Sequence, residues 1–148
     1  MPTPETETWL ALKSRIDTLP IPADWEVYEP DVTVEPPHDE IGPLPYVLVS
    51  DVRNEHQRIG ISGNGKVRGV LHIRSGTLML ALHYPVARPA TYTQLVEMAG
   101  KIAAHFPADT RMKYGSTCLR VTQDADADQP YREGVDRVLI VRVRWANA

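Results

Sequence analysis

Apolar residues recur at helical spacing in two stretches of the chain, residues 5–19 and residues 91–106. The first stripe consists of Trp9, Leu12, Ile16 and Leu19, and the second of Leu95, Ala99, Ile102 and Phe106. Steps of three and four residues place each stripe on one face of a helix. Pro20 and Pro107 follow the stripes directly, where proline ends a helix. Two amphipathic helices are therefore expected.

Other stretches show the short apolar runs or the alternation of β-strands. The expected strands cover residues 24–30, 46–52, 67–74, 77–84 and 135–146, with two more in residues 110–123 around Gly115-Ser116. In the last strand the residues Leu139, Val141, Val143 and Trp145 alternate with Ile140, Arg142 and Arg144.

Residues 67–74 and 77–84 flank Ser75-Gly76, a dipeptide typical of turns, and predict a two-residue hairpin. In that register one face is almost wholly apolar, with the pairs Ile73 and Leu78, Leu71 and Leu80, Gly69 and Leu82, and Val67 and Tyr84. We therefore expect five residues of this face to be core: Leu71, Ile73, Leu78, Leu80 and Leu82.

The order helix, strands, helix, strands predicts an α+β fold, a largely antiparallel sheet with the two main helices packed on one face. We expect residues 1–148 to form a single domain, since 148 residues is the size of one ordinary domain. Residues 29–45 are too rich in proline for a central strand and predict an extended connection. Residues 53–66 are polar and glycine-rich and predict a protruding hairpin loop.

Composition narrows the function classes. A net charge of −3 and a pI near 5.9 disfavour binding of nucleic acid through a broad basic face. We expect neither a membrane span nor a secretion signal, because no apolar run is long enough and no charged-then-apolar leader is present. The single cysteine, Cys118, excludes an internal disulfide and suits a reducing cytoplasm.

One glycine-rich stretch, Gly60 to Lys66, matches the start of a phosphate-binding P-loop. The match ends at Val67, where a P-loop has Ser or Thr. A P-loop also needs its glycines to open a helix whose N-terminus holds the phosphates, and this stretch leads into an expected strand. No nucleotide binding is therefore expected here.

No other pattern predicts catalysis or metal binding. Residues 124–128 alternate Asp and Ala like a calcium loop, but they lack its glycine, its final Glu and its flanking helices, so a solvated acidic loop is expected. The five histidines lack metal-ligand spacing and are expected on the surface, and Cys118 is expected to be a small core residue. The chain is predicted not to be an enzyme, with no catalytic residue, metal or cofactor.

The candidate site is a contact surface at the loop of residues 53–66. It carries Arg53, His56, Arg58 and Lys66 against one acid, Glu55. A basic, adaptable loop on an acidic protein suits docking on an acidic surface of a neighbouring subunit or another protein, with DNA phosphate as a rival partner. The alternative is a surface loop without a partner.

The chain as a whole resembles the small tail-terminator proteins (minor tail protein U-like) of long-tailed bacteriophages. The resemblance is carried by residues 95–121, in which a helix runs into His-Phe-Pro, a Thr-Arg turn and a strand pair, and by residues 135–146. Residues 8–19, 45–52 and 66–73 also fit in order. Residues 30–45 and 124–130 are not part of it.

The resemblance implies a structural virion protein, an α+β subunit that forms a hexameric ring on the head-proximal end of the tail tube. Such a ring stops tube polymerisation and joins the tail to the head-side connector, while the genomic DNA passes through without specific binding. The implied partners are further copies of the chain, the tail tube protein and the neck protein, assembled in the host cytoplasm without a membrane. A head-completion or neck connector protein of the same virion is the alternative.

Overall fold

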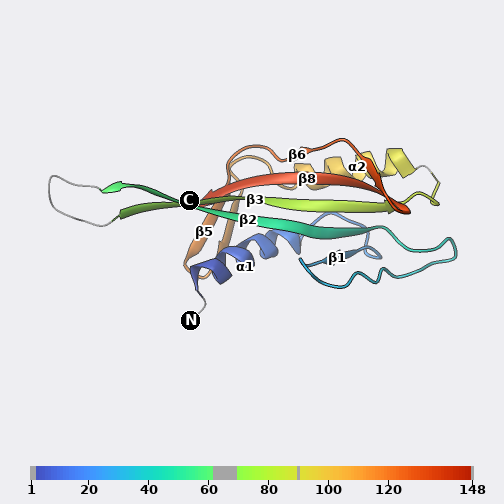
Figure 1. Cartoon of the computed structure of the whole chain (residues 1–148), viewed down its shortest axis with the longest axis horizontal. Helices are drawn as coiled ribbons and strands as arrows, with labels where there is room; N and C mark the ends of the chain where they lie inside the picture. The colour runs from blue at the N-terminus through green and yellow to red at the C-terminus, as the bar shows by residue number, and fades with distance from the viewer. Residues whose placement is uncertain (1–2, 62–69, 90, 148) are drawn as a thin grey trace.

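The computed structural model describes residues 3–61, 70–89 and 91–147 (Figure 1). In chain order the elements are α1 (Pro4–Ile16), β1 (Glu26–Tyr28), β2 (Tyr46–Ile61), β3 (Val70–Pro85), α2 (Thr91–Ala104), β4 (Arg111–Tyr114), β5 (Thr117–Val121), β6 (Asp126–Ala127), β7 (Tyr131–Glu133) and β8 (Asp136–Asn147).

The strands form one sheet in the order β1-β2-β3-β8-β5-β4, and β6 and β7 pair with further parts of β8. Only the β1–β2 pair is parallel among the described strands. Together with the two helices this confirms the expected α+β class and the largely antiparallel sheet.

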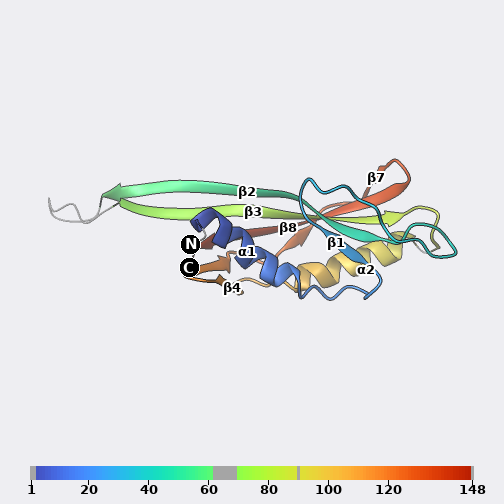
Figure 2. The ribbon, with the colours of Figure 1, turned by 90° about the horizontal axis from the view of Figure 1, so that it is seen from below.

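The core lies on one face of the three central strands. In register across the sheet, Val49 of β2 meets Leu80 of β3, which meets Val141 of β8, and all three side chains are buried. The same cluster contains the predicted helix residues Leu12, Ile16, Leu19, Leu95, Ala99, Ile102 and Phe106. Figure 2 shows α1 and α2 on the same side of β2, β3 and β8. The apolar stripes that predicted the helices therefore form the half of this core that the helices contribute.

Helix α1 begins where its local sequence supplies a cap. The Thr6 amide donates to Thr3 Oγ1 over 3.3 Å, and Pro4 occupies the first turn, where its missing N–H costs nothing. Acidic residues in the first turn and basic residues in the last turn complement the helix dipole.

The C-terminal ends of the two helices meet below the sheet (Figure 2). The Arg15 guanidinium donates to the His105 carbonyl oxygen over 2.7 and 3.0 Å, and His105 Nε2 lies 3.0 Å from the Arg15 carbonyl oxygen. Burial lowers the pKa of His105, the Arg15 charge lowers it further, and the hydrogen bond to Arg15 opposes both effects. The two reciprocal contacts join α1 to the segment that follows α2.

The predicted hairpin at Ser75-Gly76 is wrong. Residues 70–85 form one continuous strand, which pairs with β2 on one side and from Ser75 onward with β8 on the other. Leu78, Leu80 and Leu82 are fully buried as expected, but they belong to this single strand. The side chains of Leu71 and Ile73 are not among those described, and residues 67–69 lie outside the described part.

The acidic stretch 124–128 is not simply a solvated loop. Asp126 begins the short strand β6, and residues 131–133, for which no strand was expected, form β7. Both strands pair with β8. The expected strand pair around Gly115-Ser116 is confirmed as β4 and β5, with Gly115 in the left-handed conformation at φ 57°.

Candidate assembly surface

The most prominent feature is a two-stranded arm, residues 54–61 of β2 and 70–74 of β3. These residues pair with each other, with His56 opposite Arg74 and Arg58 opposite His72. In the described part of β8, pairing with β3 starts only at Ser75, so the arm has no third strand. In Figure 1 the arm runs on past the ends of the neighbouring strands. The expected loop of residues 53–66 is thus strand as far as Ile61, and its tip lies outside the described residues.

The base of the arm is held by three contacts from other elements. Arg74 donates from its side chain to Glu5 of α1 over 3.0 Å, and its amide donates to Asn147 Oδ1 over 3.0 Å. At Gly76 an added Cβ would lie 1.8 Å from the Arg53 carbonyl oxygen and 2.6 Å from Trp145 Cζ2. The buried Trp145 ring therefore occupies the space that a side chain at position 76 would need.

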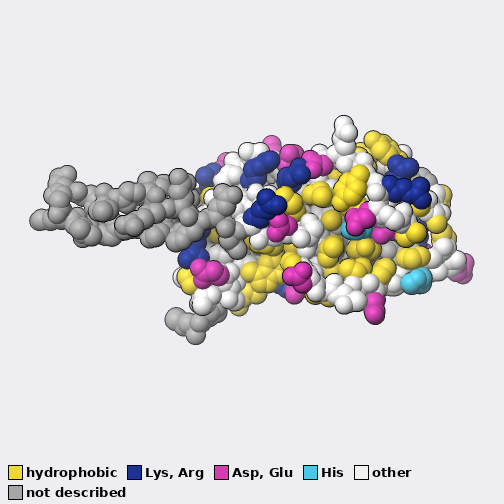
Figure 3. Space-filling model, in the orientation of Figure 1, with side chains coloured by type: hydrophobic (Ala, Val, Ile, Leu, Met, Phe, Trp, Pro, Cys, Tyr) yellow, Lys and Arg dark blue, Asp and Glu magenta, His cyan; other side chains and the backbone are white. Residues whose placement is uncertain are grey.

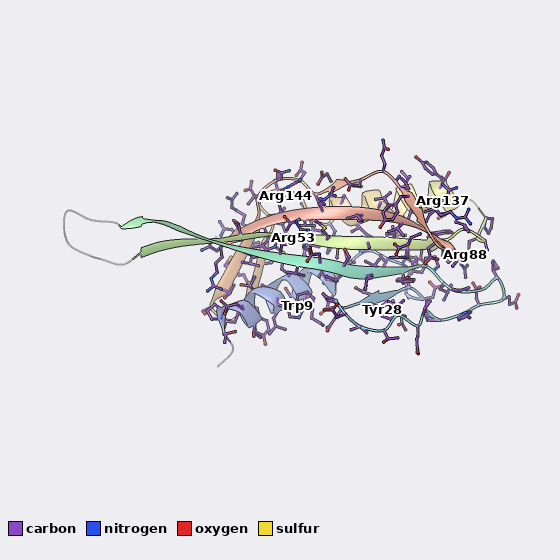
Figure 4. The ribbon with its side chains drawn as sticks, viewed as in Figure 1. Trp9, Tyr28, Arg53, Arg88, Arg137 and Arg144 are labelled. Carbon is purple, nitrogen blue, oxygen red and sulfur yellow. The ribbon has the colours of Figure 1, made fainter. Side chains whose placement is uncertain are left out.

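Of the four residues expected to make contacts, only Arg53 has a side chain that the structure describes. Arg53 lies at the base of the arm on the open sheet, where its side chain is 65% exposed and bonds Asp51 over 2.7 Å (Figure 4). His56 and Arg58 have paired strand backbone further along the arm. Lys66 lies outside the described residues.

A shallow hollow that carries hydroxyl and thiol groups lies beside the arm base. It is lined by Pro4, Thr8, Arg74, Ser116, Thr117, Cys118, Leu119 and Asn147. Glu7 accepts hydrogen bonds from Thr117 over 2.7 Å and from Ser116 over 3.1 Å, and the Thr117 bond is the first cause of its lowered pKa. A carboxylate stabilised in this way is a weak base, so its role is to fasten the β4–β5 turn to α1. Cys118 is half-buried rather than core.

Arginine and aspartate side chains pair along β8 on the sheet face away from the helices. Arg142 forms an ion pair with Asp128, and Arg144 bonds Asp126 over 3.2 Å. In Figure 3, Lys or Arg side chains lie next to Asp or Glu side chains above this strand. The acidic stretch therefore neutralises Arg142 and Arg144 of β8. The described residues contain no group of three or more His, Cys, Asp or Glu that could hold a metal ion.

A second cluster on this face includes His83. The hairpin expected from the sequence placed this residue on the surface, opposite Arg68. His83 is only 8% exposed, pairs in register with Tyr46 and Val138, and lies 3.3 Å from the Asp136 carboxylate through Nδ1. Its ring stacks on Tyr46 at 4.6 Å between centroids. Burial, and then the Asp136 charge, raise the pKa of Tyr46 to about 12. The cluster therefore joins β2, β3 and β8 on this face of the sheet.

The proline-rich connection, residues 29–45, is fixed by Arg88, which follows β3. Arg88 bonds the Asp39 carboxylate over 2.7 Å and donates to the carbonyl oxygens of Pro43 and Gly42. The Arg88 bond is the largest cause of the lowered pKa of Asp39. Nothing in the local sequence pattern marked Arg88, because its partners lie more than forty positions away.

At the same end of the molecule, residues 24–40, the acidic segment, carry seven Asp and Glu and no Lys or Arg. All seven side chains are exposed: Asp24, Glu26, Glu29, Asp31, Glu35, Asp39 and Glu40. Asp39 bonds Arg88, and Glu29 lies 3.9 Å from Lys13. Figure 1 places the connection and the arm at opposite ends of the long axis.

Comparison with known proteins agrees with this subunit architecture. A solved structure with 17% identity superposes with a TM-score of 0.69 and covers 99% of this chain and 97% of its own chain, which shows a shared fold. No curated protein matches the sequence. Neither described helix has the length and apolar character to cross a bilayer.

The family-level match is broader and carries a description. The family model described as phage tail terminator protein matches residues 7–145, from the first turn of α1 to Trp145 near the end of β8. This span includes both helices, the arm and the acidic segment. The chain therefore belongs to the phage tail terminator family.

Proposed function

We propose that the chain forms a hexameric ring that caps the tail tube of a long-tailed phage, ends tube polymerisation and joins the tail to the head-side connector. The observation that carries this proposal is the family match over residues 7–145. The ring is a structural part of the virion at the head-proximal end of the tail, with the genomic DNA passing through it.

The described surface suits assembly better than catalysis. Its outstanding features are a two-stranded arm without a third strand and an exposed acidic segment, whereas the Glu7 carboxylate next to the hollow already binds Thr117 and Ser116. We include Arg53, His56, Arg58 and Lys66 in the proposal as contact residues toward a neighbouring subunit, because their charge opposes that of the rest of the chain.

A head-completion or neck connector protein remains the second candidate, since it would be found in the same region of the virion. The two roles differ in what happens to the tube. A terminator limits tube length, whereas a neck connector acts on a tail whose length is already set.

Tail assembly without this protein therefore tests the proposal. Tube protein assembled in its absence should give tubes of uncontrolled length, and adding the purified chain during assembly should cap them. Electron microscopy of the tubes gives the length distribution and shows whether a ring sits at one end. Tubes of unchanged length distribution, with no ring at either end, would contradict the terminator role and favour the neck role.

A further inference from the structure

Two arginines face each other at one edge of the sheet without an acidic partner. Arg132 of β7 and Arg137 of β8 are directly opposite in register, so their side chains share one face of the strand pair, an arrangement that destabilises like charges. Within the described residues neither arginine forms an ion pair, and Arg137 Nε is buried without a hydrogen-bond partner. The subunit therefore leaves the positive charge of this pair uncompensated.

The surroundings of the pair add positive potential and apolar area. Arg137 lies 6.0 Å from the centroid of the Tyr92 ring, beside the N-terminal end of α2 (Figure 4). The first turn of α2 holds no acidic residue, so the helix dipole adds to the positive potential there. Tyr92 and Val96, one turn apart on α2, and Val135 between β7 and β8 are exposed. These three residues and the two arginines are named the basic surface.

The nearby acidic residues do not neutralise the basic surface. Glu133 and Asp136 are also opposite each other in register, and the alternation along a strand places them on the other face of the sheet. There Asp136 bonds His83 over 3.3 Å. On α2, Glu97 and Lys101 lie one turn apart and balance each other in charge. The basic surface therefore keeps a net positive charge on a chain whose net charge is −3.

The acidic segment, residues 24–40, is complementary to the basic surface. Five of its seven carboxylates have no cationic partner in the described part of the chain: Asp24, Glu26, Asp31, Glu35 and Glu40. Val32 in the segment and Ile41 directly after it are exposed apolar residues. Each surface thus offers the other a charge of opposite sign and apolar area to cover.

We propose that the basic surface of one subunit docks on the acidic segment of a second copy of the chain. Among the described strands, β1 of the acidic segment pairs only with β2, and β7 pairs only with β8, so the two surfaces border opposite edges of the sheet. In Figure 1 the connection lies below β2, whereas α2 lies above β8. A contact between two unlike surfaces closes into a ring when the rotation between subunits allows it. The inference rests on the proposed ring and adds which surfaces join the subunits.

Two variants reverse the charge of one surface each. The basic-reversed variant carries Arg132→Glu and Arg137→Glu, and the acid-reversed variant carries Glu26→Lys, Glu35→Lys and Glu40→Lys. Asp31 stays unchanged, because its φ of 61° is a left-handed conformation that Lys rarely adopts. Arg111→Glu with Lys113→Glu, at two exposed positions of β4, is the control matched to the basic-reversed variant. Denaturant unfolding checks that each variant is folded, and Arg132→Glu alone, at an exposed site, replaces the double change if that change prevents folding.

Light scattering over a concentration series then gives the result. Each reversed variant alone should be monomeric, with its subunit contact weakened about ten-fold or more, while the β4 control should assemble like the unaltered chain. An equal mixture of the two reversed variants should regain the assembled mass. In an alternating ring, each intact basic surface meets an intact acidic segment, and each reversed surface meets the other reversed surface. If the unaltered chain assembles only on tail tubes, the same samples are compared by electron microscopy of tubes.

The other outcomes are distinct. Assembly of either reversed variant alone would overturn the docking proposal while leaving the ring function standing. Folded variants whose mixture stays monomeric would overturn it too. If the basic-reversed variant still forms rings but loses binding to duplex DNA that the unaltered chain shows, the arginine pair serves DNA instead. If the unaltered chain forms no ring in solution or on tubes, the proposed function itself fails.

Discussion

Gly76 shows how a single residue can be required by a contact far away in the sequence. Its position in β3 is enclosed by the Arg53 backbone and the Trp145 ring. The Ser-Gly pair resembles a turn in the sequence, yet the glycine serves close packing between strands. The base of the arm depends on this contact.

Gly76→Ala should therefore destabilise the protein by about 1–3 kcal/mol, the usual cost of overpacking a core. Gly100→Ala is the control, because an added Cβ there meets nothing within 4 Å and α2 gains a better helix former. It should stabilise by roughly 0.5–1 kcal/mol. Denaturant unfolding measures both, and equal effects of the two substitutions would refute the packing account.

His105 makes stability depend on pH. The pKa of His105 is lowered in the folded state, chiefly by burial. The unfolded chain, in which a histidine has its ordinary pKa of about 6.5, therefore binds the proton more tightly than the folded chain. Stability from this residue is complete above that pH and falls as the pH decreases below it.

His105→Asn should accordingly flatten the decrease of unfolding free energy between about pH 7.5 and pH 5.5. The variant should also lose some stability at high pH, because its contacts with Arg15 and Thr18 change. His38→Asn, at an exposed site, should leave the pH dependence as it is. An unchanged slope for His105→Asn would show that the residue does not control the pH response.

Among the elements, the proline-rich connection depends most clearly on one side chain. Arg88 bonds a carboxylate and two carbonyl oxygens of this segment. A planar guanidinium can hold several acceptors at once, which a lysine ammonium does in a different geometry. The connection covers the sheet face near Tyr28 and Tyr46.

Arg88→Ala should loosen residues 29–45 without unfolding the sheet. Limited proteolysis should then cut within this segment at a higher rate than in the unaltered chain, while the apolar core on the helix side remains protected. Arg111→Ala, at an exposed position of β4, should not change the cleavage rate. Equal cleavage in both variants would argue that proline stiffness alone orders the connection.

The elements that the sequence predicted correctly are those whose signal is local. Both helical stripes and the alternation of β8 appear within a single segment, and all their apolar residues are buried as expected except Trp9, which is partly buried against the core. The β2–β3 pairing was missed because Ser75-Gly76 satisfies a local turn rule, whereas the glycine is required by its close approach to the Arg53 backbone and the Trp145 ring. Strands β6 and β7 were missed because they are short and exist only by pairing with β8.

At the candidate site the local signal was also incomplete. The polar, glycine-rich composition of residues 53–66 predicted a loop, but it did not show that β2 stays paired with β3 as far as Ile61. One signal was available for the ion pairs of β8. Asp126 and Asp128 share the two-residue spacing of Arg142 and Arg144, which is the pattern expected of facing strands with opposite charges.

At the scale of the whole molecule, the arm lies at one end of the long axis and the acidic segment at the other (Figure 1). Between them, side chains of both helices and of one sheet face form a single apolar core. A subunit with two unlike ends suits the head-to-tail contacts from which a closed ring is built.

The mass of the purified protein in solution tests the central claim most directly. Light scattering coupled to size exclusion, run over a concentration series at low and at moderate salt, should show a hexamer or a concentration-dependent route to one. Higher salt should weaken the assembly, because charged contacts are screened. A monomer, or a dimer that grows no further at any concentration and forms no ring on tail tubes, would contradict the account.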